Sequence, residues 1–197
     1  MKILLIAVFS TLILLLLFQS FILMPKNKTE EQPYTVVLKD NAFEIRLYPE
    51  ATMATIYADV HKYQDLSGPG FRKLAGYIFG GNESKQQIAM TAPVHMDIND
   101  KVSSMSFVMP AGYTEDNLPK PSDAKVVIHK SAAEYAAAIR FGGYASDQDI
   151  KAYSQKLSDL LKEKGITTIG NFRFLGYDPP YKFLGRRNEI IVSINWK

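Results

Sequence analysis

The chain has 197 residues with a nearly balanced charge, 23 lysines and arginines against 20 aspartates and glutamates, and 47% of its residues are hydrophobic. The two signs of charge are interspersed, which argues against a nucleic-acid partner because nucleic-acid binders gather basic residues on one face. The absence of cysteine excludes disulfides, thiolate-ligated iron and the covalent attachment of c-type heme.

The chain begins with an uninterrupted apolar segment. No charged residue occurs between Ile3 and Pro25, and about 20 apolar residues are enough for a helix to cross a bilayer. A cleaved secretory signal is the alternative, but its apolar region would span only ~7–15 residues, and no small-residue cleavage motif precedes Pro25. We therefore expect residues 1–25 to form a transmembrane or signal-anchor helix, with the membrane as a partner.

The remainder divides into a linker, residues 26–34, and one domain of ordinary size, residues 35–197. The basic residues on the two sides of the apolar segment nearly balance, so the positive-inside rule discriminates little between orientations. We expect the domain to lie outside the cytoplasm, as a signal anchor would place it. If the segment is cleaved, the protein would be secreted or periplasmic.

The first half of the domain predicts strand, strand, helix, strand, strand. Alternating apolar residues indicate half-buried strands at residues 43–48, 53–60, 88–98 and 105–109. Between the second and third strands, Pro69 and Gly70 open a helix, and Gly80 and Gly81 close it. Its apolar residues recur at i, i+3, i+4 and i+7, the spacing of one helix face: Phe71, Leu74, Ala75 and Ile78.

The second half repeats the same order. Strands are predicted at residues 125–129, 135–141, 172–177 and 189–196. The intervening helix begins after Ser146, which with Asp149 three residues later forms the pattern of a capping box. Two ββαββ units with short connections imply an α+β domain with antiparallel sheets, packed helices and internal pseudo-symmetry.

Several short segments occur in an order and spacing that is similar to the SOUL/heme-binding protein family. They are FEIRLYP at 43–49, FRKLAGYIFGGN at 71–82, IAMTAPV at 88–94, SFVMP at 106–110, LPKP at 118–121, RFGGYAS at 140–146 and GRRNEI at 185–190. The resemblance implies a distorted antiparallel β-barrel of two ββαββ pseudo-repeats with two flanking helices. This agrees with the element order derived from periodicity.

The resemblance also implies a ligand, which is heme or another tetrapyrrole held without a covalent bond. The apolar face of the first helix, Phe71, Leu74 and Ile78, would contact the ring, and Lys182 with nearby Arg186 would meet the propionates. An apolar cleft with cationic residues at its rim matches a flat apolar ligand that has carboxylates at one edge.

Structural roles are the alternative for each of these residues. Apolar side chains at helical spacing belong more often to a core than to a ligand cleft. Arg186, Arg187 and Glu189 are expected to form an ion-pair and hydrogen-bond cluster, and Lys182 is expected to be solvated if it does not bind ligand.

Axial ligation of iron is not expected. Members of the resembling family that present a histidine to iron have it in the strand where this chain has Leu47, and leucine is no metal ligand. Of the three histidines, His95 alternates with the apolar residues of its strand and is expected on the surface. No metal site is therefore predicted.

No catalytic motif occurs in the sequence, and Glu44 and Glu189 are expected on the solvent face of their strands. Three functions remain open. The first is a membrane-tethered tetrapyrrole carrier or buffer. The second is a binder of other amphipathic small molecules, since the fold resembles multidrug-sensing effector-binding domains. The third is a small-molecule hydrolase or isomerase that uses the same cleft.

Overall fold

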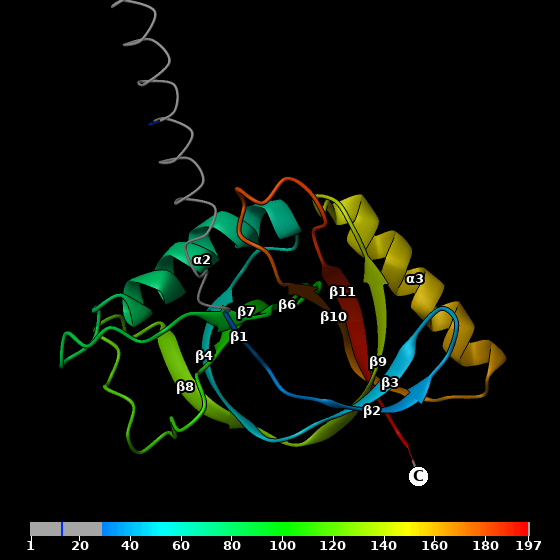
Figure 1. The fold of residues 1–197 in the computed structure, drawn as a ribbon, viewed down its shortest axis with the longest axis horizontal. Helices are drawn as coiled ribbons and strands as arrows, with labels where there is room; N and C mark the ends of the chain where they lie inside the picture. Colours follow the sequence, from blue (N-terminus) through cyan, green and yellow to red (C-terminus); the bar gives the residue numbers. More distant parts are fainter. Residues whose placement is uncertain (1–12, 14–28, 197) are drawn as a thin grey trace, which may run out of the picture.

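The computed structural model describes residue 13 and residues 29–196, which form one large antiparallel sheet with two long helices (Figure 1). A separate parallel pair joins β1 (Glu30–Glu31) to β5 (Thr91–Ala92). In spatial order, the main sheet consists of β2 (Thr35–Lys39), β3 (Glu44–Tyr48), β9 (Glu134–Phe141), β11 (Asn188–Ile194), β10 (Thr168–Gly176), β6 (Val94–Asp97), β7 (Ser103–Val108), β4 (Ala51–Ala58) and β8 (Val126–Ser131).

The two predicted ββαββ units are present as β3-β4-α2-β6-β7 and β8-β9-α3-β10-β11. Each unit contributes its first strand to the other unit: β3 pairs with β9, and β8 pairs with β4. The units join at the centre through the antiparallel pair β10–β6. Without the additional edge strand β2, the order inward from one edge is β3, β9, β11 and β10, and from the other edge it is β8, β4, β7 and β6. These two series use equivalent strands of the two units, which confirms the internal pseudo-symmetry.

The expectation of a β-barrel is wrong, because the sheet is open. Its edges are β2 and β8, which are not paired with each other. β2, which the sequence patterns did not predict, adds to the outer edge of β3 by pairing Thr35 with Leu47. In the described part of the chain, no helix is both long and apolar enough to span a bilayer. The predicted anchor, residues 1–25, lies outside the described residues except for residue 13, and it stays a prediction.

Both helices cover the same face of the curved sheet, α2 (Tyr63–Ile78) over β4 and β7, and α3 (Asp147–Glu163) over β9, β10 and β11 (Figure 1). The core lies between the helices and the sheet, where burial of apolar side chains supplies most of the stabilisation. Among its fully buried side chains are Ile45, Ile56, Leu74, Ile78, Met105, Leu157, Leu161 and Ile190.

Helix α2 begins earlier than predicted, so that Pro69 lies inside the helix. The backbone N–H of Tyr63 donates to Oδ1 of Asp147 on α3, at 2.6 Å. Because an acceptor from the other helix satisfies a free N–H of the first turn, the start of α2 depends on a tertiary contact. The side chain of Lys62, the residue before the helix, makes no capping hydrogen bond.

The N-terminal strap, residues 30–34, covers part of the opposite, helix-free face. It is held by the β1–β5 pair and by a hydrogen bond from the Gln32 N–H to the Ala92 oxygen at 2.7 Å. Gln32 also lies 2.8 Å from Nε2 of His95, which is buried rather than on the surface as expected. Burial, together with the charge of Arg173, lowers the pKa of His95 to about 3. The neutral ring therefore donates from Nε2 to the Gln32 oxygen.

The capping box at the start of α3 predicts a measurable effect on stability. Ser146 Oγ accepts the Asp149 N–H at 3.2 Å, and the Asp149 carboxylate accepts the Ser146 N–H at 3.0 Å. We expect Ser146→Ala to lower the free energy of unfolding by about 1 kcal/mol in urea denaturation. Ser154→Ala, inside the same helix, should leave it unchanged or raise it, since alanine favours helix. Equal losses in both variants would contradict this role of the cap.

Candidate functional site

The loop between β10 and β11, residues 177–187, is held in shape by Asp178. Its carboxylate accepts hydrogen bonds from Nζ of Lys182, at 2.6 Å, and from the backbone N–H of Arg187. The Lys182 N–H donates to the Pro179 oxygen at 3.1 Å, which closes a turn. Gly185 adopts the left-handed conformation (φ 63°), which glycine reaches without a steric penalty. The loop is therefore an ordered structure built on one carboxylate.

Arg186 completes the loop from the inside. Its guanidinium donates to the carbonyl oxygens of Pro179, Lys182 and Asp178, at 2.6, 3.0 and 3.2 Å. It also stacks on the ring of Tyr144, 4.4 Å from the centroid, while the Tyr144 hydroxyl donates to the Pro180 oxygen at 2.9 Å. The Nε of Arg186 is buried and has no hydrogen-bond partner among the described residues. Arg186 thus has a structural role and one unused donor.

The outside of this loop is apolar. Tyr181, Phe183 and Leu184 are 76%, 77% and 86% exposed, the highest values among the exposed large hydrophobic side chains of the described chain. Lys182 lies between them, and Tyr144 is exposed beside the loop. We call these five residues the loop surface. A cluster of exposed aromatic and aliphatic side chains of this kind marks a binding site more often than isolated surface leucines do.

The loop between β10 and β11 lies between the starts of the two helices (Figure 1). Tyr63, the first residue of α2, lies near enough to Arg186 for the guanidinium charge to affect the pKa of the Tyr63 hydroxyl. Burial raises the pKa of Tyr63, and the charge of Arg186 opposes this increase. The N–H contact between Tyr63 and Asp147 joins the two helix starts at the same place.

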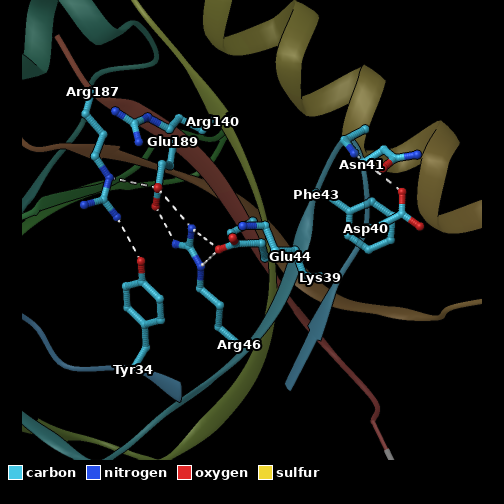
Figure 2. A pocket seen from close by; sticks show the side chains of 12 residues that line it. Tyr34, Lys39, Asp40, Asn41, Phe43, Glu44, Arg46, Arg140, Arg187 and Glu189 are labelled. Atoms are coloured by element: carbon cyan, nitrogen blue, oxygen red, sulfur yellow. Dashed lines mark hydrogen bonds and ion pairs between the residues drawn. The ribbon is translucent and has the colours of Figure 1, made fainter. Parts of the chain in front are cut away.

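A buried ion network supports the base of the loop from the helix-free face. Figure 2 shows Arg46 and Arg187 both directed at the carboxylate of Glu189. Arg46 binds Glu189 through two hydrogen bonds, at 2.6 and 3.1 Å, and Arg187 binds it at 3.0 Å. The Tyr177 hydroxyl donates the fourth hydrogen bond, at 2.9 Å. Because Tyr177 and Arg187 are the first and last residues of the loop, Glu189 holds both ends together.

The same network extends to the N-terminal strap. Arg187 donates to the Glu31 carboxylate at 2.9 Å and to the Tyr34 hydroxyl at 3.1 Å. Arg46 binds Glu44 at 2.8 Å and lies over the ring of Tyr34, 4.2 Å from the centroid. Strap, first strand and loop base are therefore connected by two guanidinium groups.

The electrostatics keep the Glu189 carboxylate charged. Burial alone raises its pKa, but the hydrogen bonds and charges of Arg46 and Arg187 outweigh burial and hold the pKa below its usual value. Burial lowers the pKa of Arg46, but the hydrogen bonds to Glu189 and Tyr48 and the charges of these two groups together more than reverse this effect. The group is a buried ion pair in which each charge depends on its partners.

The residues predicted to bind the ligand fall in two places. Leu74 and Ile78 are buried in the core beneath α2, and Phe71 packs on Phe107 with ring centroids 5.4 Å apart. Lys182 and Arg186 lie in the loop, near the start of α2. Ile78 is fifteen residues from Tyr63, which is about 22 Å along a helix. The structure therefore does not bring the helix residues and the two cations into one exposed cleft. Their assignment as ligand contacts stays a prediction.

Two expectations about charged residues need correction. Glu189 is fully buried, not on a solvent face, because Arg46 reaches it across β9. The predicted cluster of Arg186, Arg187 and Glu189 exists only in part: Arg187 pairs with Glu189, whereas Arg186 binds backbone carbonyls. Leu47 is half-buried in a hollow beside Pro33 and Tyr34 and is not part of the loop surface.

Sequence reasoning missed the apolar residues of the loop surface and the partner of Arg46. A signal for the first was available, since YKFL lies between Pro180 and Gly185, where no strand or helix would bury it. No comparable signal exists for Arg46. Its partner is 143 residues away, and only the sheet brings the two together.

A comparison with protein families decides the relationship of the chain. The profile described as SOUL heme-binding protein matches residues 29–193, almost the whole described domain. The chain belongs to the SOUL heme-binding protein family. Heme-binding protein 2 of Mus musculus is 28% identical over 166 residues, with 80% of each chain covered. Heme-binding protein 1 of Xenopus laevis is 29% identical over 156 residues, with 76% of this chain and 82% of the relative covered.

Solved structures similar to this SOUL protein show how widely the fold is shared. The C-terminal domain of EcmrR matches with a TM-score of 0.57 at 12% identity, covering 82% of this chain and 98% of that one. A hydrolase from Listeria innocua matches with a TM-score of 0.55 at 8% identity, covering 81% and 94%. At this identity the likeness shows the fold alone.

The ion network predicts a pH-dependent effect of Arg46→Met. Removal of one partner from a buried ion pair leaves a buried charge, so we expect a loss of about 3–5 kcal/mol in the free energy of unfolding at pH 7. In the native protein the folded-state pKa of Glu189 is lowered, so its stabilisation is present above the ordinary carboxyl pKa and is lost as pH falls through the folded-state value. In the variant, Glu189 can be protonated, so the loss should shrink at pH 4.

Urea denaturation followed by fluorescence of Trp196, the single tryptophan, measures both values. Arg140→Met is the matched control, because Arg140 is exposed on the neighbouring strand of the same face. It should change stability by no more than about 0.5 kcal/mol. If Arg46→Met costs as much at pH 4 as at pH 7, the loss comes from packing and not from the buried charge.

Proposed function

We propose that this SOUL protein binds heme or a related tetrapyrrole, without a covalent bond, at the loop surface. The observation that carries the proposal is the run of three highly exposed apolar side chains around Lys182, in a chain of a family described as heme-binding. Exposed Tyr181, Phe183 and Leu184 can cover one face of a flat apolar ring. A lysine at the same place can pair with a carboxylate at the ring edge.

The residues at this place suit such a ligand in charge as well as in shape. Lys182 is half exposed, and Asp178 is its one ion-pair partner among the described residues. Arg186 lies in the same loop, but its guanidinium is bound to backbone carbonyls and its Nε is buried, so Lys182 is the loop cation that can reach the ligand. The bound group would supply its own metal chemistry. The protein residues would contribute apolar contact, orientation through Lys182, and exclusion of water from one ring face.

A strong axial ligand from the protein is not part of the proposal. Each of the three histidines is engaged elsewhere: His61 with the Asn99 oxygen, His95 with Gln32, and His129 with the Thr55 hydroxyl. A tetrapyrrole held mainly by apolar and carboxylate contacts is suited to exchange. We therefore propose a carrier or buffer role, with residues 1–25 as the membrane tether.

Hemin titration tests the loop surface. Residues 29–197 contain every contact described above, so this fragment is the first choice once cooperative unfolding shows that it is folded. We expect a shift of the Soret band and quenching of Trp196. Lys182→Ala and Phe183→Ala should each weaken binding about tenfold, because each removes a contact worth more than 1 kcal/mol.

Two control variants make the test specific. Tyr57→Ala removes an exposed aromatic residue from β4, outside the loop surface, and should leave the affinity unchanged. Leu47→His places an imidazole in the first strand of the repeat, and it should leave the Soret band unchanged if the ligand lies on the loop surface. A sharpened Soret band in Leu47→His would move the site to that strand. Equal affinity for a flat apolar cation would favour a general amphipathic binder.

Membrane tethering is tested by fractionation. We expect the full chain to remain in the membrane pellet after an alkaline carbonate wash, because an apolar helix of about 20 residues is not released by loss of peripheral contacts. The fragment 29–197 should be recovered in the supernatant. Release of the full chain by the wash would contradict a spanning anchor, and a shortened N-terminus in the expressed protein would indicate a cleaved signal.

A further inference from the structure

A pocket lies on the helix-free face, away from the loop surface. It is bounded by the turn between β2 and β3 and by β9 and β11, and its volume is about 360 Å³. Small-molecule pockets span roughly 300–1,000 Å³, so this one suits a small ligand. Twelve residues line it, and most are polar or charged (Figure 2).

The hollow exists because β9 presents two alanines on this face, Ala136 and Ala138, before Arg140. Ala136 faces Arg46 across the β3–β9 pair, and Ala138 faces Glu44. Because these two positions carry only methyl groups, the Arg46 side chain can cross β9 to reach Glu189. The ion pair and Ala138 form part of the pocket lining, and the turn of residues 39–43 forms one wall.

Each carboxylate that lines the pocket already binds a cationic side chain. Glu189 accepts four hydrogen bonds, two from Arg46 and one each from Arg187 and Tyr177, which is about the capacity of a carboxylate. Glu44 binds Arg46 at 2.8 Å, and Asp40 binds Lys164 of the α3 end at 2.8 Å. No lining carboxylate is therefore left for a further cation.

Two lining cations have no such partner. Arg140 lies directly opposite Glu189 in the β9–β11 pair, the place where opposite charges usually pair across strands. Yet no carboxylate of the described residues lies within 4 Å of Arg140 or of Lys39, because Glu189 is turned toward Arg46 and Arg187. Four cationic side chains line the pocket against three carboxylates. The pocket lining therefore carries one more positive than negative charge.

We infer that this pocket binds a small organic anion through its carboxylate or phosphate group, with Arg140 and Lys39 as charge partners. A guanidinium donates two parallel hydrogen bonds to either group, and an ammonium adds a point charge. The rest of the ligand lies over Ala138. The site is independent of the loop surface, since no residue of the loop surface lines it.

Thermal shift and isothermal titration with the full chain in detergent micelles test the inference. The probes are succinate and inorganic phosphate, with chloride used to keep the ionic strength constant. We expect at least one probe to raise the melting temperature and to bind at one site. Arg140→Gln should weaken that binding at least tenfold, and Lys39→Gln should weaken it to a smaller extent. The probe that binds more tightly identifies the preferred acid group.

Arg72→Gln is the matched control, since Arg72 is an exposed arginine of α2 that does not line the pocket. It should bind the probe as the unaltered chain does, and so should Lys182→Ala, which alters the proposed tetrapyrrole surface. No binding of either probe would overturn the inference. Equal loss in Arg140→Gln and Arg72→Gln would also overturn it, because the effect would then follow overall charge and not a site.

Discussion

The buried ion pair between Arg46 and Glu189 is the constraint on which the arrangement of this domain depends. The two residues belong to different ββαββ units and lie on β3 and β11, with β9 between them. A buried carboxylate without a partner is strongly destabilising, so the register of three strands must place Arg46 opposite the alanines of β9. Arg187 and Tyr177 complete the shell of Glu189. The same carboxylate thereby determines the base of the 177–187 loop.

The two faces of the sheet carry different kinds of side chain. The helix-covered face holds the apolar core and supplies most of the stability. The helix-free face carries buried polar groups, each satisfied by a specific partner, and the N-terminal strap covers part of it. The loop surface projects from the end of β10, where neither helix covers it. Rigid support below and exposed apolar side chains above are the combination expected of a binding loop on a stable scaffold.

The sequence predicted the repeated element order, the α3 capping box and most strand positions correctly, because alternation and helical spacing are local properties. It placed the start of α2 too late, since Asp147 on α3 provides the first acceptor for that helix. It predicted a surface position for His95. Alternation did place His95 on the face opposite the core correctly, but Gln32 of the strap covers it there. It predicted Lys182 and Arg186 near one another. The apolar neighbours of Lys182 were not recognised, although their flanking proline and glycine already indicated an exposed loop.

The sequence by itself determined the family, the α+β class and the pseudo-symmetric pair of units, because these follow from short-range periodicity and from motifs in fixed order. Only the tertiary structure decided that the sheet stays open, that Leu74 and Ile78 belong to the core, and that Glu189 is a buried ion partner. The physical reason is distance along the chain. Edge pairing and burial depend on which segments meet in space, and Arg46 and Glu189 meet only after all the strands between them have been ordered.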